Sequence, residues 1–118
     1  MAVLHNAVLL RLFMGENDRH GRQPLYEAVV LKARELGLAG ATVLRGPLGF
    51  GLSSTLNTAK ILRLSEDLPM VVEIVDSEEK VRTLMAALEP MLAASSTLVT
   101  LERVEVVRYG RANAAPFG

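Results

Sequence analysis

Apolar residues gather in four short stretches of the chain, separated by polar, glycine-containing or helical segments. The first stretch, residues 7–14, is almost continuously apolar, which indicates a mostly buried strand. Residues 41–44 and 70–75 have the same character, and Pro69 suits the start of a strand because proline lacks an N–H. Residues 98–109 are rich in valine, with alternation in their second half. The pattern therefore predicts four strands.

Two further segments carry apolar residues at helical spacing, and each has a signal for where it ends. The first helix is predicted over residues 25–36, with Gly37 as its stop. The second follows Asp76, which we expect to cap it together with Glu79, and we expect Pro90 to end or kink it. The apolar positions are Leu25, Val29, Ala33 and Leu36 in the first helix, and Val81, Leu84, Met85 and Leu88 in the second.

The predicted order is strand, helix, strand, strand, helix, strand. This order is typical of the α+β class with a ferredoxin-like βαββαβ arrangement, a four-stranded antiparallel sheet with both helices on one face. We expect a single domain over residues 1–112 and a flexible tail over residues 113–118. The other face of the sheet should also be partly apolar, which favours self-association. The residues expected there are Val43, Val71, Val75 and Val107.

Composition narrows the classes of function. The 118 residues carry 13 basic and 13 acidic side chains, and this zero net charge argues against a nucleic-acid binder. The absence of cysteine excludes a disulfide framework and a thiol nucleophile, and two histidines make a histidine-rich metal site improbable. No apolar run is long enough to insert into a membrane and no signal peptide is recognised, so a cytoplasmic location is expected. Ten of the basic residues are arginines, which favours recognition of carboxylates or phosphates.

One long connection carries the strongest chemical signal. Between Glu35 and Glu66 the chain has no acidic residue, and glycines lie among its basic residues, an arrangement that can hold an anion. The candidate ligand-binding residues here are Arg45, Gly46, Gly49, Gly51 and Arg63. The alternative interpretation is an ordinary flexible hairpin with solvated arginines.

Arginines also follow the last predicted strand. Arg108 and Arg111 could clamp a phosphate, although a strand end solvated by charged side chains is as common.

The loop after the first strand holds Glu16, Asp18, Arg19 and His20. Carboxylates beside an imidazole could act as a general acid–base pair or as metal ligands. Polar residues at a helix entry also commonly hydrogen-bond to the loop backbone, so this structural alternative stays open.

Six motifs stand out along the chain: residues 15–21, 24–28, 39–46, 49–51, 64–69 and 73–76. Together they resemble the PII-like family known as domain of unknown function 190. The resemblance covers about nine-tenths of the chain and ends near Tyr109.

That family is similar to the PII signal-transduction proteins, and the resemblance implies a homotrimer with a small-molecule site between subunits. It implies that the connection after Arg45 is a T-loop, which in PII proteins docks onto a channel or an enzyme. In PII proteins an adenine nucleotide lies between the base of this loop and the end of the last strand. Gly46 and Gly49 would then lie at the loop base, and Arg108 and Arg111 would be the last-strand basic pair.

Two departures from the PII pattern qualify this expectation. PII proteins carry a Gly-Asp-Gly-Lys stretch before the last strand, whereas residues 93–97 here contain neither glycine nor lysine. A nucleotide with fewer phosphates than ATP, or another anion, is therefore expected. Residues 46–60 contain no tyrosine, so nucleotidylation of a loop tyrosine is not expected.

The sequence therefore predicts a non-enzymatic trimeric regulator that binds a small anion, an adenine nucleotide in the first instance, between subunits. The anion would order the loop at residues 45–63 and control a protein partner. The family context suggests a membrane channel or transporter, in particular a fluoride channel, as that partner. The alternatives are a small enzyme or metal-binding protein that uses Glu16, Asp18 and His20, and an adaptor that binds no ligand.

Overall fold

The computed structural model describes residues 5–50 and 67–110. Four strands form one antiparallel sheet in the order β4-β5-β1-β6, and a two-stranded ribbon, β2-β3, lies apart from it. The elements in chain order are β1 (His5–Gly15), β2 (Arg19–His20), β3 (Gln23–Pro24), α1 (Leu25–Glu35), β4 (Thr42–Arg45), β5 (Pro69–Asp76), α3 (Glu78–Leu92) and β6 (Leu98–Val106).

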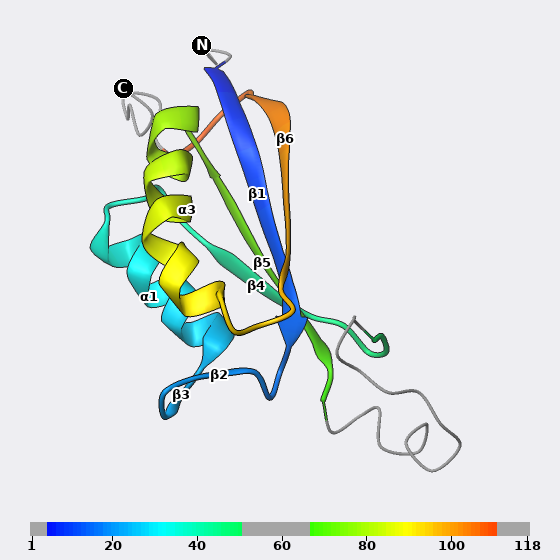
Figure 1. Ribbon diagram of the computed structural model, residues 1–118. Coiled ribbons are helices and arrows are strands. Elements are labelled where there is room, and N and C mark those ends of the chain that lie inside the picture. Colours follow the sequence, from blue (N-terminus) through cyan, green and yellow to red (C-terminus); the bar gives the residue numbers. More distant parts are fainter. Residues whose placement is uncertain (1–4, 51–66, 111–118) are drawn as a thin grey trace.

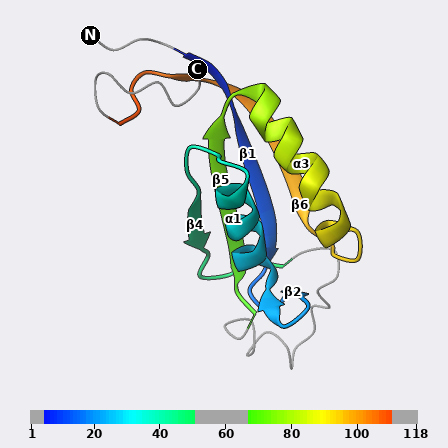
Figure 2. The same cartoon turned by 90° about the vertical axis from the view of Figure 1, so that its left-hand side faces the viewer.

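Both helices cover the same face of the four-stranded sheet (Figures 1 and 2). The predicted α+β arrangement is thereby confirmed. The core lies between the sheet and the helices, where β5 shows strict alternation: Met70, Val72 and Ile74 are buried, and the residues between them are half-buried. The other buried core residues are Val8, Leu10, Leu12, Met14, Leu25, Val29, Ala33, Val81, Leu84 and Leu88.

Neither helix among residues 5–50 and 67–110 covers the opposite face of the sheet (Figures 1 and 2), which we call the open face and which carries an apolar row across all four strands. Cross-strand pairing places Leu44 beside Val71, Val71 beside Phe13, and Phe13 beside Leu98. Val75 lies further along the same face. This open face is therefore partly apolar, as expected from the sequence.

Next to the apolar row, an ionic group lies on the same open face. Arg11 donates through Nε to Oε2 of Glu73 and through Nη1 to Oε1 of Glu102, both at 2.8 Å. The carboxylates raise the pKa of Arg11, chiefly through the hydrogen bond to Glu73. The group links β1 to both neighbouring strands.

Two residues expected on the open face lie elsewhere. Val43 pairs with the buried Val72 and packs against the core, so it faces the helices. Val107 follows β6 and is exposed. The prediction for Val43 was wrong because β4 has only four residues, with two adjacent apolar side chains and no alternation from which to assign a face.

The helix ends also correct the sequence analysis. Ser77, not Asp76, caps α3: its hydroxyl accepts a hydrogen bond from Lys80 N. Pro90 neither ends nor sharply breaks α3, which continues to Leu92. Met91 and Leu92 pack against the core, and this contact holds the last turn in place although Pro90 cannot donate a backbone hydrogen bond.

The last strand is shorter than predicted. It ends at Val106, which pairs with His5, and residues 107–110 then turn away from the strand. Gly110 has φ of +67°, in the left-handed region that glycine adopts at no steric cost.

Candidate functional site

Three segments meet at one end of the sheet, where the long connection leaves β4 and re-enters β5. They are residues 15–18 at and after the end of β1, residues 45–49 at and after the end of β4, and residues 67–69 before and at the start of β5. Backbone hydrogen bonds join them, because Gly46 N donates to Pro69 O and Glu16 N donates to Leu68 O, each at 2.8 Å. We call this assembly the loop base.

Arg45 and Glu16 form an ion pair within the loop base. Arg45 Nη2 donates to Glu16 Oε1 at 2.9 Å, and the Arg45 side chain is 56 % exposed whereas that of Glu16 is 25 % exposed. In the sequence the two residues belong to separate candidate clusters, and the fold brings them together. The guanidinium is accessible to a ligand, and an incoming anion would compete with Glu16 for it.

Gly46 and Gly49 of the loop base pack closely against Pro69. A Cβ at Gly46 would lie 2.7 Å from Cγ of Pro69, and one at Gly49 would lie 3.0 Å from the same atom. Both glycines therefore let the chain cross over the Pro69 ring. Their role in the structure is local packing, and Gly51 and Arg63 lie outside the described residues.

The acidic residues around the loop base mainly organise its backbone. Asp18 accepts a hydrogen bond from Gly15 N at 3.0 Å, and Asp67 accepts one from Asn17 N at 3.0 Å. The structural alternative that the sequence left open for Asp18 is thereby confirmed. Asp67 was not singled out from the sequence, because only the fold places it beside the loop after β1.

The cluster needed for an enzyme or metal site is not formed. Glu16 pairs with Arg45, Asp18 bonds to backbone, and His20 and Arg19 are exposed on the β2-β3 ribbon. Within residues 5–50 and 67–110, no three side chains of the metal-binding types come together.

Arg108 lies at the opposite end of the sheet from Arg45. Arg45 pairs with Met70, which pairs with Met14, whereas β6 ends opposite His5. The intervening stretch of β1 from His5 to Met14 spans about 30 Å at roughly 3.3 Å per residue. One subunit therefore does not bring Arg45 and Arg108 to a common site, and only different subunits could do so. Arg111 lies outside the described residues.

At the Arg108 end, a buried carboxylate and a tyrosine hold the loop between α1 and β4. Asp76 is fully buried and accepts from Ala39 N at 2.8 Å and from Ser77 N at 2.7 Å. Tyr109 donates its hydroxyl to Ala39 O at 2.6 Å. This network was not predicted, because residues 70–75 are apolar on both faces of the strand apart from Glu73, and only the fold shows that Asp76 shares the buried face with Met70, Val72 and Ile74.

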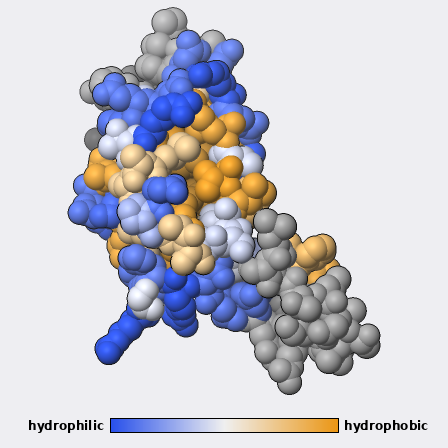
Figure 3. Space-filling view, viewed as in Figure 1, coloured by the Kyte–Doolittle hydropathy of each residue, from blue (hydrophilic) through white to orange (hydrophobic). Residues whose placement is uncertain are grey.

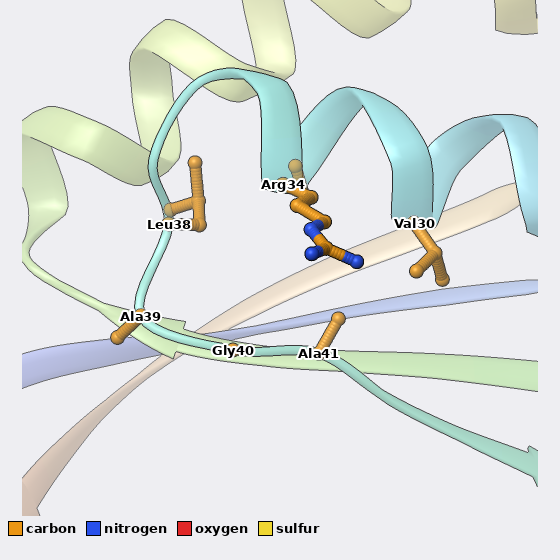
Figure 4. Close-up of a pocket in the computed structure, with 7 residues that line it drawn as sticks. Val30, Arg34, Leu38, Ala39, Gly40 and Ala41 are labelled. Carbon is orange, nitrogen blue, oxygen red and sulfur yellow. The ribbon is translucent and has the colours of Figure 1, made fainter.

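A cavity of about 260 Å³ lies beside the same loop (Figure 4). Arg34 extends across it from α1 towards Ala41, and Val30 and Leu38 line it. Its volume is below the range of about 300–1,000 Å³ that is usual for small-molecule pockets. Taken alone, it does not identify a ligand.

The segment between α3 and β6 lies at the loop-base end of the sheet, since Leu98 pairs with Phe13. Ser95 Oγ bonds to Leu92 O at 2.8 Å and accepts from Thr97 N at 3.3 Å. The hydrogen-bonding groups of Ser95 and Thr97 are therefore used within the segment. Residues 93–97 also contain no lysine that could bind a phosphate.

No helix in the described part of the chain is long and apolar enough to cross a membrane.

Comparison with known proteins identifies relatives along nearly the whole chain. The profile of the DUF190 family, described as an uncharacterized ACR, matches residues 7–106. A UPF0166 protein of Aquifex aeolicus is 39% identical over 99 residues, covering 84% of this chain and 91% of the relative.

Solved structures share the fold at low sequence identity. CPII of Thiomonas intermedia, bound to ADP, AMP and acetate, superposes with a TM-score of 0.65 at 20% identity, covering 90% of this chain and 93% of CPII. A second structure, CPII described as a nitrogen regulatory PII-like protein and bound to ADP, AMP and bicarbonate, gives 0.67 at 18% identity, with 92% and 94% covered. The chain therefore has a PII-like fold.

Proposed function

The chain belongs to the DUF190 family and has a PII-like fold, and on this premise we propose that it is a non-enzymatic, PII-like regulatory protein. It binds a small anion, an adenine nucleotide in the first instance, between the subunits of a homotrimer. Binding orders the connection at about residues 45–63 and thereby changes affinity for a protein partner.

The observation that carries the proposal is the accessible guanidinium of Arg45 at the loop base. It lies where the long connection leaves the sheet, on a fold whose solved example CPII holds ADP and AMP. An anion that displaces Glu16 from Arg45 acts directly on the start of the connection. Binding of an anion at Arg45 is thus coupled to the conformation of the connection at about residues 45–63, which in this proposal contacts the partner.

The open face of the sheet supports self-association. Its apolar row spans Leu44, Val71, Phe13 and Leu98, and two of these side chains are about half-exposed in the single chain: Leu44 at 49% and Leu98 at 58%. Covering this face with neighbouring subunits removes the row from water. A trimer would also allow Arg45 of one subunit to meet Arg108 of the next.

Among adenine nucleotides, AMP and ADP are the preferred ligands in this proposal. The α3–β6 segment at the loop-base end has no lysine and uses Ser95 and Thr97 for its own hydrogen bonds. ATP would bring more negative charge to a site where Glu16, Asp18 and Asp67 are the neighbouring carboxylates. Each added phosphate therefore meets more repulsion than attraction.

The partner in this proposal is a membrane channel or transporter, with a fluoride channel suggested by the resemblance to the family. The cytoplasmic location, the domain limits at residues 1–112 and the tail at residues 113–118 stay predictions from the sequence. Residues 113–118 lie outside the described part of the chain.

Isothermal titration with AMP, ADP, ATP and cyclic AMP tests the proposal. We expect saturable binding of one nucleotide per subunit, with AMP or ADP bound more tightly than ATP. Arg45→Ala should weaken binding by about tenfold, as expected for loss of a hydrogen-bonded charge. Arg82→Ala, at an exposed position on α3, serves as the matched control and should bind like the unchanged protein. No heat of binding for any nucleotide would refute the nucleotide part of the proposal.

A further inference from the structure

The loop after β1 contains a small, well-defined hairpin. Arg19 pairs with Pro24 and His20 with Gln23, so Gly21 and Arg22 form a two-residue turn. Gly21 has φ of +62°, as this kind of tight turn requires. The sequence analysis predicted only a polar loop here.

The hairpin is anchored at both ends. Asp18 N donates to Gly15 O at 3.2 Å, the Asp18 carboxylate accepts from Gly15 N, and Leu25 N at the start of α1 donates to Asp18 O at 2.7 Å. These bonds join the hairpin to the end of β1 and the beginning of α1. The direction in which it projects is therefore set by the fold.

The hairpin presents two guanidinium groups that no other described side chain pairs with. Arg19, His20 and Arg22 are exposed, and none of them makes an ion pair or side-chain hydrogen bond with another described residue. By contrast, four other arginines each pair with a glutamate: Arg11, Arg45, Arg82 and Arg103. No acidic residue occurs between Asp18 and Glu27.

The hairpin lies at the loop-base end of the molecule. It projects below the sheet beside the start of α1, and the chain leaves β4 and enters β5 at the same end (Figure 1). In the space-filling view the surface over the hairpin is hydrophilic and protrudes from the body of the domain (Figure 3). A partner that approaches the loop base therefore approaches this hairpin too.

We propose that the β2-β3 hairpin is a second docking element, which recognises an acidic patch on a partner protein through Arg19 and Arg22. The planar guanidinium fork matches carboxylates in a bidentate manner, and the anchored turn holds the two forks in a defined arrangement. This contact does not require bound nucleotide. It extends the interaction surface beyond the connection after Arg45.

An acidic protein surface fits the hairpin better than a lipid membrane does. Its exposed residues, Arg19, His20, Gly21 and Arg22, include no apolar side chain that could enter the acyl region. Two arginines per hairpin fall below the clusters of about four to eight basic residues that are typical of lipid-binding segments.

Fluorescence anisotropy with a short labelled peptide of glutamate and aspartate tests the proposal. We expect the protein to bind this peptide at low salt and to release it as salt is raised. Arg22→Glu should weaken binding by about fivefold or more, as for reversal of a charge at a contact. Arg34→Glu is the matched control, because it makes the same charge change at an exposed arginine of α1 that has no ion pair with another described residue. It should change the affinity for the peptide by less than about twofold.

Arg19→Glu provides a second variant on the opposite strand of the hairpin and should act like Arg22→Glu. Equal effects of Arg22→Glu and Arg34→Glu would show that only net charge matters and would overturn the proposal. Absence of peptide binding would do the same, as would binding to phosphatidylserine vesicles without binding to the peptide. Failure of nucleotide binding in calorimetry would leave this docking element standing, so the two proposals fail separately.

Discussion

The buried carboxylate of Asp76 joins three parts of the fold, since it ends β5, precedes α3 and holds Ala39 before β4. Asp76→Asn keeps the side-chain volume but replaces one acceptor oxygen with an NH2 donor. Either Ala39 N–H or Ser77 N–H then faces another donor. A buried donor without an acceptor costs about 1–3 kcal/mol, so we expect the free energy of unfolding to fall by about 2 kcal/mol.

Asp76→Ala removes both acceptors and leaves a cavity, so it should cost roughly 3–5 kcal/mol. In a thermal melt, each kcal/mol lost should lower the midpoint by roughly 3–6 °C in a domain of this size. Denaturant unfolding followed by circular dichroism, at one fixed protein concentration because the protein is proposed to self-associate, measures the loss.

Glu105→Gln, an exposed neutralisation on β6, is the control and should stay within about 0.5 kcal/mol. If Asp76→Asn unfolds at the same denaturant concentration as this control, the two hydrogen bonds do not stabilise the fold. The explanation by two hydrogen bonds to Asp76 would likewise be contradicted if Asp76→Ala were as stable as Asp76→Asn.

Three further perturbations test other parts of the account. Phe13→Asp places a charge in the middle of the apolar row, and light scattering should show the mass falling from about three chains to one; an unchanged mass would exclude the open face as the interface. Gly46→Ala puts a methyl group 2.7 Å from the rigid ring of Pro69 and should lower the free energy of unfolding by about 1–3 kcal/mol, whereas an unchanged stability would show that the loop base adjusts freely. The hydrogen bond from Arg103 is the main cause of the lowered pKa of Glu78. The ionised Glu78 therefore stabilises the folded state at pH values above the ordinary pKa of 4.5, and this stabilisation is lost as the pH falls through the lower pKa of the folded state. Arg103→Gln should raise that pKa in a carbon-13 NMR titration, and an unchanged titration curve would contradict the assignment.

The fold could be predicted from sequence because the strands are short, almost continuously apolar runs, whereas the helices repeat their apolar residues at helical spacing. Residues 7–14 and 70–75 are of the first kind, and α1 and α3 are of the second. Errors arose where local pattern carries little information. The four residues of β4 show no period, so the face occupied by Val43 depends on its pairing with Val72.

The candidate site was predictable in its residues but not in their contacts. Arg45 and Glu16 were both candidates, yet their ion pair joins positions 29 residues apart and exists only in the folded chain. Topology explains the arrangement. β1 and β4 both run antiparallel to β5, so their carboxyl ends lie at the same end of the sheet. β6 runs antiparallel to β1, so Arg108, which follows β6, lies at the opposite end.

Mixed trimers test most directly whether the anion site lies between subunits. Arg45→Ala and Arg108→Ala should each weaken nucleotide binding by about tenfold when every subunit carries the same change. Co-expression of the two variants, with different tags, gives trimers in which some interfaces combine an intact Arg45 with an intact Arg108 of the neighbour. For random assembly about a quarter of the sites should recover, as measured by calorimetric stoichiometry. No recovery in verified mixed trimers, or full binding by either variant alone, would contradict an inter-subunit site built from these two arginines.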